Sequence, residues 1–282
     1  MKTILGDNPF FDINHKTGGT DLGFQKDTMK AVIEEYTNHG PCRLMLSDHL
    51  EFHDGIFEVL CQFRPEDLSL VLLAPVPHTI NSLVATGGYK SLISNVGPLS
   101  LMLISFGLAC QLGKITRLST FFYRHGIQKY IRNQLKPYRN RNVNVTHFGL
   151  HNVFADMLLA SKNRAVINSF IRAVEDLGLA PIILTQNMGS FLGLDGIRNC
   201  TICGSVNPVG YMMSPSKQET EVAICENKFG HKIWAMQVLA GGSAQVCDAL
   251  SYLKGLKIKQ FVYATSKTDR VKEVLDSISN QA

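Results

Sequence analysis

One short stretch, "LMLSDHLEFHDG" (residues 44–55), combines acidic and imidazole side chains at a spacing that suits proton transfer. Asp48 follows an apolar run, and His53 comes five residues later. A carboxylate can orient an imidazole and stabilise its charged form, and the imidazole can then donate or accept a proton near neutral pH. His151 follows a second apolar run and could act as the other acid or base. We therefore predict Asp48, His53 and His151 as catalytic residues.

Polar residues also follow most of the other apolar runs of the chain. They carry carboxylate, amide or imidazole groups, which suit hydrogen bonds to a polar substrate. We predict that the following residues bind substrate: Asp7, Asn8, His15, His78, Asn152, Gln186, Asn187 and Asn207.

Five of the nine histidines belong to this group of run-end residues, so a metal site is the alternative use of the same side chains. Three imidazoles could bind a divalent metal, with Asp48 or Glu51 adding an oxygen ligand. No compact HxH or HExxH spacing supports this reading. Our first prediction is therefore no metal, and the alternative ligands are His15, His49, His53, His78 and His151.

Strand-like and helix-like segments alternate along the chain and form eight strand–helix units. Near-continuous apolar strands between amphipathic helices are typical of a parallel sheet covered by helices. No GxGxxG turn follows the first strand, which disfavours a doubly wound open sheet. We predict a single α/β domain over residues 1–282, a (β/α)8 TIM barrel, with chemistry at the carboxyl ends of its strands.

Residues 79–142 are too long for a simple connection between strands three and four, and we predict a helical insertion there. Nine lysines and arginines but no Asp or Glu lie between residues 68 and 155, although the net charge of the chain is only +5. Residues 91–113 carry no charge. We expect a lid or an interface: residues 91–141 would contact a second copy of the chain or an anionic membrane surface. No nucleic-acid module accompanies the basic residues, so a nucleic-acid partner is disfavoured.

The cysteine content and the first residues predict a cellular location. Seven cysteines is an odd number, and the chain opens without a secretory signal. We expect a reduced, cytoplasmic protein, with peripheral membrane attachment through the insertion as an addition to that expectation.

The stretch "FVYATSKTDRVKEVL" (residues 261–275) predicts a last strand, a polar turn and a helix start with two cations. Backbone N–H groups and the positive end of a helix dipole favour an anion at such a turn. We predict that a phosphate binds there, from a cofactor or from the substrate, through Gly241, Gly242, Ser266, Lys267 and Arg270.

The chain also resembles the aldo-keto reductases, most clearly over its last third. "IWAMQVLAGG" is similar to that family's strand seven and the turn after it, and "FVYATSKTDRVKEVL" to its strand eight and cofactor-phosphate turn. "LMLSDHLEFH" matches the strand-two Asp and the catalytic Tyr five residues later, and "VTHFGLHN" resembles the strand that carries the active-site His. The resemblance implies a TIM barrel that binds a nicotinamide cofactor.

Two departures from the family pattern concern catalysis. His53 stands where the family has its Tyr, and "LVLLAPVPH" presents no Lys on strand three. The chain is also similar to uncharacterised aldolase-like barrels that share a GxNPF start and a segment like "NPVGYMMSPS".

From these features we expect an enzyme that acts on a small anionic, oxygen-rich substrate, such as a sugar phosphate or another carbonyl compound. Lyase, aldolase or isomerase chemistry is favoured over oxidoreductase chemistry, because the catalytic Tyr and Lys are not matched. An NADP-dependent oxidoreductase is the first alternative, and a binding or scaffold protein that acts through the basic insertion is the second. The sequence does not decide between NADP and a divalent metal as cofactor.

Overall fold

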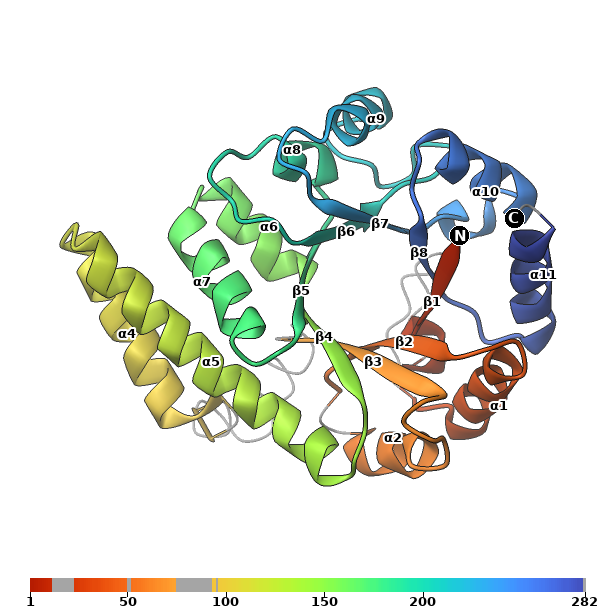
Figure 1. Cartoon of the computed structure of the whole chain (residues 1–282), viewed down its shortest axis with the longest axis horizontal. Helices are drawn as coiled ribbons and strands as arrows, with labels where there is room; N and C mark the ends of the chain where they lie inside the picture. Colours follow the sequence, from red (N-terminus) through yellow and green to blue (C-terminus); the bar gives the residue numbers. More distant parts are fainter. Residues whose placement is uncertain (12–22, 50–51, 75–92, 95, 281–282) are drawn as a thin grey trace.

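Eight parallel strands form a closed barrel in the order of the sequence, and β8 pairs back onto β1. Figure 1 shows this arrangement in a computed structural model, which describes residues 1–11, 23–49, 52–74, 93–94 and 96–280. The strands are β1 (Lys2–Gly6), β2 (Cys42–Ser47), β3 (Leu68–Leu73), β4 (Val145–Leu150), β5 (Ala180–Thr185), β6 (Thr201–Ser205), β7 (Lys232–Met236) and β8 (Gln260–Tyr263).

Helices surround the barrel and connect the strands (Figure 1). They are α1 (Lys26–Thr37), α2 (His53–Leu60), α4 (Pro98–Leu112), α5 (Thr116–Asn140), α6 (Asn152–Ala160), α7 (Arg164–Glu175), α8 (Met188–Leu192), α9 (Lys217–Glu226), α10 (Val246–Gly255) and α11 (Thr268–Ser279), with short 3-10 turns at Asn8–Phe11 and Ala240–Gly242. The predicted (β/α)8 barrel with a helical insertion between strands three and four is confirmed.

The sheet separates two apolar layers. One lies between strands and helices and includes Phe10, Phe148, Phe191 and Phe261, each fully or almost fully buried. The other fills the inside of the barrel, with side chains from strands all around it: Ile4, Met45, Val71, Leu73, Ile182, Leu184, Cys203, Trp234 and Val262. Successive strand residues point to opposite faces, so both faces of each strand are apolar. This explains the continuous apolar runs of the sequence.

The helical insertion consists of two described helices that form a hairpin, α4 and α5. The last turns of α5 bury Ile131, Leu135 and Tyr138, and α5 also packs along α7. The hairpin projects beyond the ring of helices (Figure 1). Residues 79–92 and 95, which belong to the predicted insertion, lie outside the described residues, so its exact limits and the single-domain assignment stay predictions.

A further difference from the sequence expectation is α6, which follows β4 directly and precedes α7. The eight predicted strand–helix units allow one helix between two successive strands, whereas β4 and β5 are joined by two, α6 and α7. His151 caps the start of α6 by accepting a hydrogen bond from the Val153 N–H at 3.5 Å, and only Ala155 of this helix is fully buried. Helix α6 is short, its nine residues are mostly apolar, and they follow the apolar strand β4 almost directly, so the sequence does not set this helix apart from the strand.

His147 lies inside the barrel, where its ring packs against Trp234 at a centroid distance of 5.2 Å. Its Nδ1 is 2.8 Å from the hydroxyl of Thr146. Burial, together with the nearby charges of Arg43 and Lys232, lowers the pKa of His147 from 6.5 to about 4. The ring is therefore neutral in the folded protein at neutral pH.

The lowered pKa of His147 predicts that the protein loses stability in mild acid. Between pH 6.5 and about 4 the unfolded chain binds a proton at His147 that the folded chain does not bind, so the free energy of unfolding falls as the pH falls through this window. We expect His147→Gln to flatten this pH dependence, measured as the urea midpoint between pH 7 and pH 4. His125→Gln, on the exposed side of α5, is the control. Equal pH profiles for the His147 variant and the wild type would contradict this role.

Candidate active site at the carboxyl end of the barrel

Asp48 and His53 are in direct contact, with 2.8 Å between Asp48 Oδ1 and His53 Nε2. The backbone brings them together: β2 ends at Ser47, the N–H of Asp48 still donates to the Leu73 carbonyl at 3.0 Å, and α2 begins at His53. Asp48 is buried, with 3% of its surface exposed, while 17% of the His53 side chain is exposed. The arrangement holds the imidazole at the barrel rim in one orientation.

The side chain of Tyr138, from α5, packs against His53. Their ring centroids are 6.0 Å apart in an edge contact, and Phe57 touches both rings. Burial raises the pKa of Tyr138 well above its usual value, and the charges of Asp48 and Asp7 raise it further. Within the described residues its hydroxyl has no hydrogen-bond partner. Sequence reasoning missed this residue because it lies in the insertion, far along the chain from His53.

Asp7 and His49 lie beside this pair but deeper. Asp7 Oδ2 accepts a hydrogen bond from the Ser47 N–H at 2.6 Å and lies 3.5 Å from His49 Nε2. The His49 ring packs against the Phe11 ring, tilted by 31° with the ring centroids 3.9 Å apart, and only 1% of the residue is exposed. Its position therefore suits packing under the rim better than contact with a ligand. Asn8, predicted to bind substrate, begins the 3-10 turn after β1.

The rim between β4 and β5 carries a second polar group of residues. His151 directly follows β4, and Asn152 begins α6. One turn later, Asp156 accepts hydrogen bonds from the Thr185 hydroxyl at 2.5 Å and the Gln186 N–H at 3.1 Å. We did not predict Asp156, since it lies inside a helix and not at a strand end. It holds the loop after β5, where Gln186 and Asn187 lie.

Two of the predicted substrate-binding amides already have partners in the fold. Asn207 is fully buried, and its side chain bonds both the carbonyl and the N–H of Tyr211 at 2.8 Å. Asn187 Oδ1 accepts a hydrogen bond from the Ser214 hydroxyl at 2.6 Å. The amide of Asn207 thus closes a turn after β6, and the amide of Asn187 links two loops.

His15, His78 and Glu51 lie outside the described residues. Among the described ones, no three His, Cys, Asp or Glu side chains gather in a way that could hold a metal ion. Of the proposed metal ligands, His49 and His53 instead face Asp7 and Asp48, respectively.

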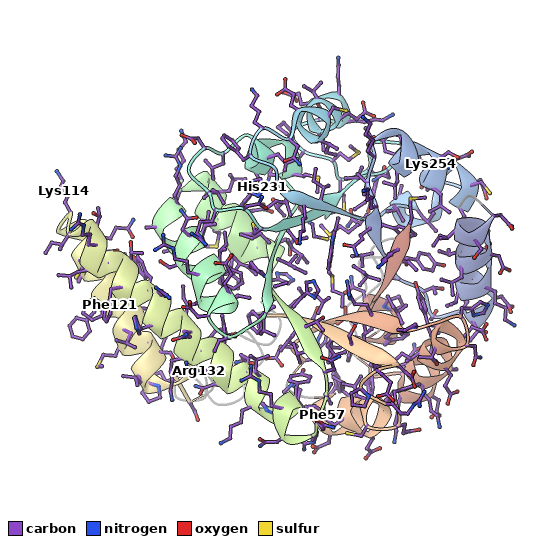
Figure 2. All side chains as sticks on the ribbon, in the orientation of Figure 1. Phe57, Lys114, Phe121, Arg132, His231 and Lys254 are labelled. Atoms are coloured by element: carbon purple, nitrogen blue, oxygen red, sulfur yellow. The ribbon has the colours of Figure 1, made fainter. Side chains whose placement is uncertain are left out.

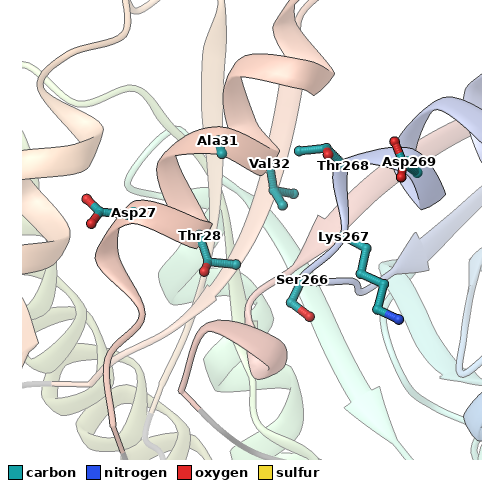
Figure 3. A pocket seen from close by; sticks show the side chains of 8 residues that line it. All are labelled: Asp27, Thr28, Ala31, Val32, Ser266, Lys267, Thr268 and Asp269. Atoms are coloured by element: carbon teal, nitrogen blue, oxygen red, sulfur yellow. The ribbon is translucent and has the colours of Figure 1, made fainter.

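A pocket of about 500 Å³ lies between α1 and the start of α11, where we predicted an anion site. Its lining includes Ser266, Lys267 and Thr268 from one side and Asp27 and Thr28 from the other (Figure 3). In Figure 3, Asp27 lies on the left side of the view and Lys267 on the right side. The pocket volume is in the range of small-molecule sites.

The cations predicted for this turn differ in their availability. Helix α11 starts at Thr268, and no side chain caps it. Arg270 pairs with Glu273, whereas Lys267 has no ion pair within the described ranges. Gly241 and Gly242 form an exposed turn with positive φ and are not among the residues that line the pocket.

The residues of this pocket fit part of a nicotinamide dinucleotide. The Lys267 ammonium and the N–H groups at the start of α11 suit a phosphate, and the hydroxyl and carboxylate groups suit the hydroxyls of a ribose. This fit rests on the kinds of groups present and on the uncapped helix.

No family model and no curated sequence matches the chain. Solved structures do. A Pseudomonas aeruginosa protein described as a candidate aldo-keto reductase superposes with a TM-score of 0.59 at 10% identity, covering 99% of this chain and 90% of that one. The holo form of an aldo-keto reductase from Bacillus halodurans superposes with a TM-score of 0.58 at 11% identity, covering 98% of this chain and 86% of that one.

These neighbours correct one sequence expectation. They are described as aldo-keto reductases, which are oxidoreductases, so the preference for lyase or isomerase chemistry over oxidoreductase chemistry is wrong. The absence of the family's Tyr and Lys weighed too heavily in that preference. At this low identity the likeness is one of fold. In its fold, the chain is a distant aldo-keto reductase-like (β/α)8 barrel.

Proposed function

We propose that this protein is an oxidoreductase that reduces a carbonyl group of a small polar substrate with a nicotinamide cofactor, or catalyses the reverse oxidation. The observation that carries the proposal is the contact between Asp48 and His53 at the carboxyl end of β2. It lies where the aldo-keto reductase resemblance places that family's Asp and Tyr. The fold of the solved neighbours supports the same class of reaction.

His53 is the proposed proton donor in the direction of reduction. Its Nε2 is held by Asp48, which leaves Nδ1 as the nitrogen that can exchange a proton with substrate. When bound, the nicotinamide supplies the hydride that the carbonyl carbon receives. The imidazolium gives its Nδ1 proton to the carbonyl oxygen, so the substrate becomes an alcohol and the imidazole becomes neutral. Asp48 stabilises the charged imidazolium before this transfer.

Burial strengthens the contribution of Asp48. Tyr138 and Phe57 pack beside the His53 ring, and Asp48 has almost no exposed surface. Electrostatic interactions are stronger where water is excluded, so the carboxylate acts on the imidazole with little screening. The packing of Tyr138 and Phe57 also holds the His53 ring in place for substrate.

The start of α11 is the proposed phosphate site of the cofactor. Lys267 and the uncapped N–H groups of the helix would hold a phosphate, and Ser266 and Thr268 would add hydroxyl groups. Arg270, which the family resemblance assigns to the phosphate, would have to exchange its ion pair with Glu273 for this contact. We therefore assign the larger share of the binding to Lys267.

We predict that His53→Asn and Asp48→Asn lower the turnover of carbonyl substrates. The loss of a positioned acid or base costs about 10²- to 10⁴-fold in rate. The assay follows nicotinamide absorbance with a panel of small aldehydes, ketones and sugar-derived carbonyl compounds. His39→Asn, which changes an exposed histidine at the end of α1, is the matched control. Turnover that survives both site substitutions would refute the assigned chemistry.

A second prediction concerns cofactor binding. The fluorescence of NADPH or NADH on titration should report binding, and Lys267→Ala should weaken it about tenfold or more, because a hydrogen bond to a charged group is lost. Lys272→Ala, an exposed cation of the same helix, should bind as the wild type does. The absence of binding for both nucleotides, together with stabilisation by a sugar phosphate that Lys267→Ala abolishes, would transfer the site to the substrate and overturn the cofactor assignment.

A further inference from the structure

The helix α4 exposes an uncharged surface that the described fold leaves uncovered. None of its fifteen residues is charged, and among the described elements it packs mainly on α5. That contact uses small residues: a side chain at Gly107 would collide with the Tyr123 ring, and one at Gly126 with Ile104. The rest of its circumference has no comparable contact with a described element. Figure 2 shows that the hairpin of α4 and α5 extends away from the barrel.

Exposed apolar side chains concentrate on this hairpin. Of the fourteen large hydrophobic residues that are exposed in the described chain, eight lie between residues 99 and 121. Leu112 at the hairpin turn is 77% exposed, the highest value of the set. We call these residues the apolar edge: Leu99, Met102, Phe106, Leu108, Leu112, Ile115, Leu118 and Phe121. Exposed apolar side chains gathered on one part of a protein in this way mark an interaction site.

The two helices contribute to one continuous part of this surface. The rings of Phe106 on α4 and Phe122 on α5 are 5.7 Å apart, and Phe122 also contacts Phe121 at 5.6 Å. In Figure 2, Phe121 points outward from the hairpin, and Lys114 lies at the end of the hairpin that is farthest from the barrel. The aromatic rings therefore connect the exposed side of α4 to that of α5.

Cations continue from this surface along α5. Lys129, Arg132 and Lys136 follow Phe121 and Phe122 at helical spacing on the exposed side, and Lys114 and Arg117 flank the apolar tip. Arg124 is different, because it makes two hydrogen bonds to Asp176, at 2.6 and 2.7 Å, that tie the hairpin to the end of α7. The remaining cations have no carboxylate within the segment to pair with.

The charge pattern decides between two occupants of the apolar edge. A second copy bound through the same surface would supply no carboxylate to these cations, because residues 68–155 contain no Asp or Glu. An anionic lipid surface pairs with the cations and accepts the apolar side chains at the same time. The described helices include none that is long and apolar enough to span a bilayer.

We propose that the α4–α5 hairpin binds an anionic membrane surface, with the apolar edge entering the headgroup region and Lys114, Arg117, Lys129, Arg132 and Lys136 contacting acidic headgroups. The inference is independent of the oxidoreductase proposal. It places a reductase or any other barrel activity next to a lipid surface.

The test is sedimentation of the full chain with vesicles of phosphatidylcholine alone and of phosphatidylcholine mixed with phosphatidylglycerol. We expect binding to the mixed vesicles that weakens with added salt. Phe106→Glu with Phe121→Glu should reduce it at least tenfold, and Lys129→Ala or Arg132→Ala by about fivefold each. Val222→Glu and Lys228→Ala, an exposed apolar residue and an exposed cation in and after α9, are the matched controls and should bind as the wild type does.

Three results would overturn the proposal. The first is the absence of binding to either vesicle, or equal binding to both. The second is a dimer in gel filtration that Phe106→Glu with Phe121→Glu dissociates, which would assign the apolar edge to a second copy. The third combines two observations: the wild type binds no vesicles, and the double variant is much less stable to heat. That result would mean that another segment of the chain covers the apolar edge.

Discussion

The parallel pairing of β8 with β1 is the constraint on which the rest of the structure depends. It closes the sheet, so every strand has two neighbours, and it brings the carboxyl ends of all eight strands to one rim. Residues as distant in sequence as Asp7, Asp48, His151 and Ser266 then belong to one end of the molecule. The inside is filled by apolar side chains from strands around the ring, so this end is a surface over a packed core and not the mouth of a channel.

Burial of carboxylates at this rim determines its local geometry. Asp7 and Asp48 are both almost fully buried, and an ionised carboxylate in such a place needs hydrogen bonds to be stable. Asp7 accepts one from the Ser47 N–H, and Asp48 faces His53. The same requirement that stabilises the fold thus orients an imidazole, which is why a structural constraint and a proposed proton donor coincide here. Tyr138 extends this coupling, because it carries the insertion into contact with His53.

The long helix α5 belongs to two environments. Its last turns pack into the helical layer through Ile131, Leu135 and Tyr138, as the helix of an ordinary strand–helix unit does. Its first half leaves the barrel and supports α4, with Arg124 and Asp176 as the bridge to the end of α7. One continuous helix therefore joins the proposed catalytic rim to the proposed membrane contact. A rigid connection of this kind would place the barrel at a set distance from the lipid.

The sequence by itself determined the alternation of strands and helices, the closed barrel, the basic insertion and the neighbourhood of Asp48 and His53. These features depend on local periodicity or on a spacing of a few residues between a strand end and a helix start.

Only the tertiary structure decided that Tyr138 packs on His53, that Asp156 holds the loop after β5, that His49 lies under Phe11 and that both ends of the Asn207 amide close a turn. The contacts of Tyr138, Asp156 and His49 join segments that are tens of residues apart, and neighbouring residues do not encode them. The Asn207 turn is local in sequence, but an Asn at a strand end can face a ligand as readily as its own backbone, and only the folded arrangement shows which of the two it does.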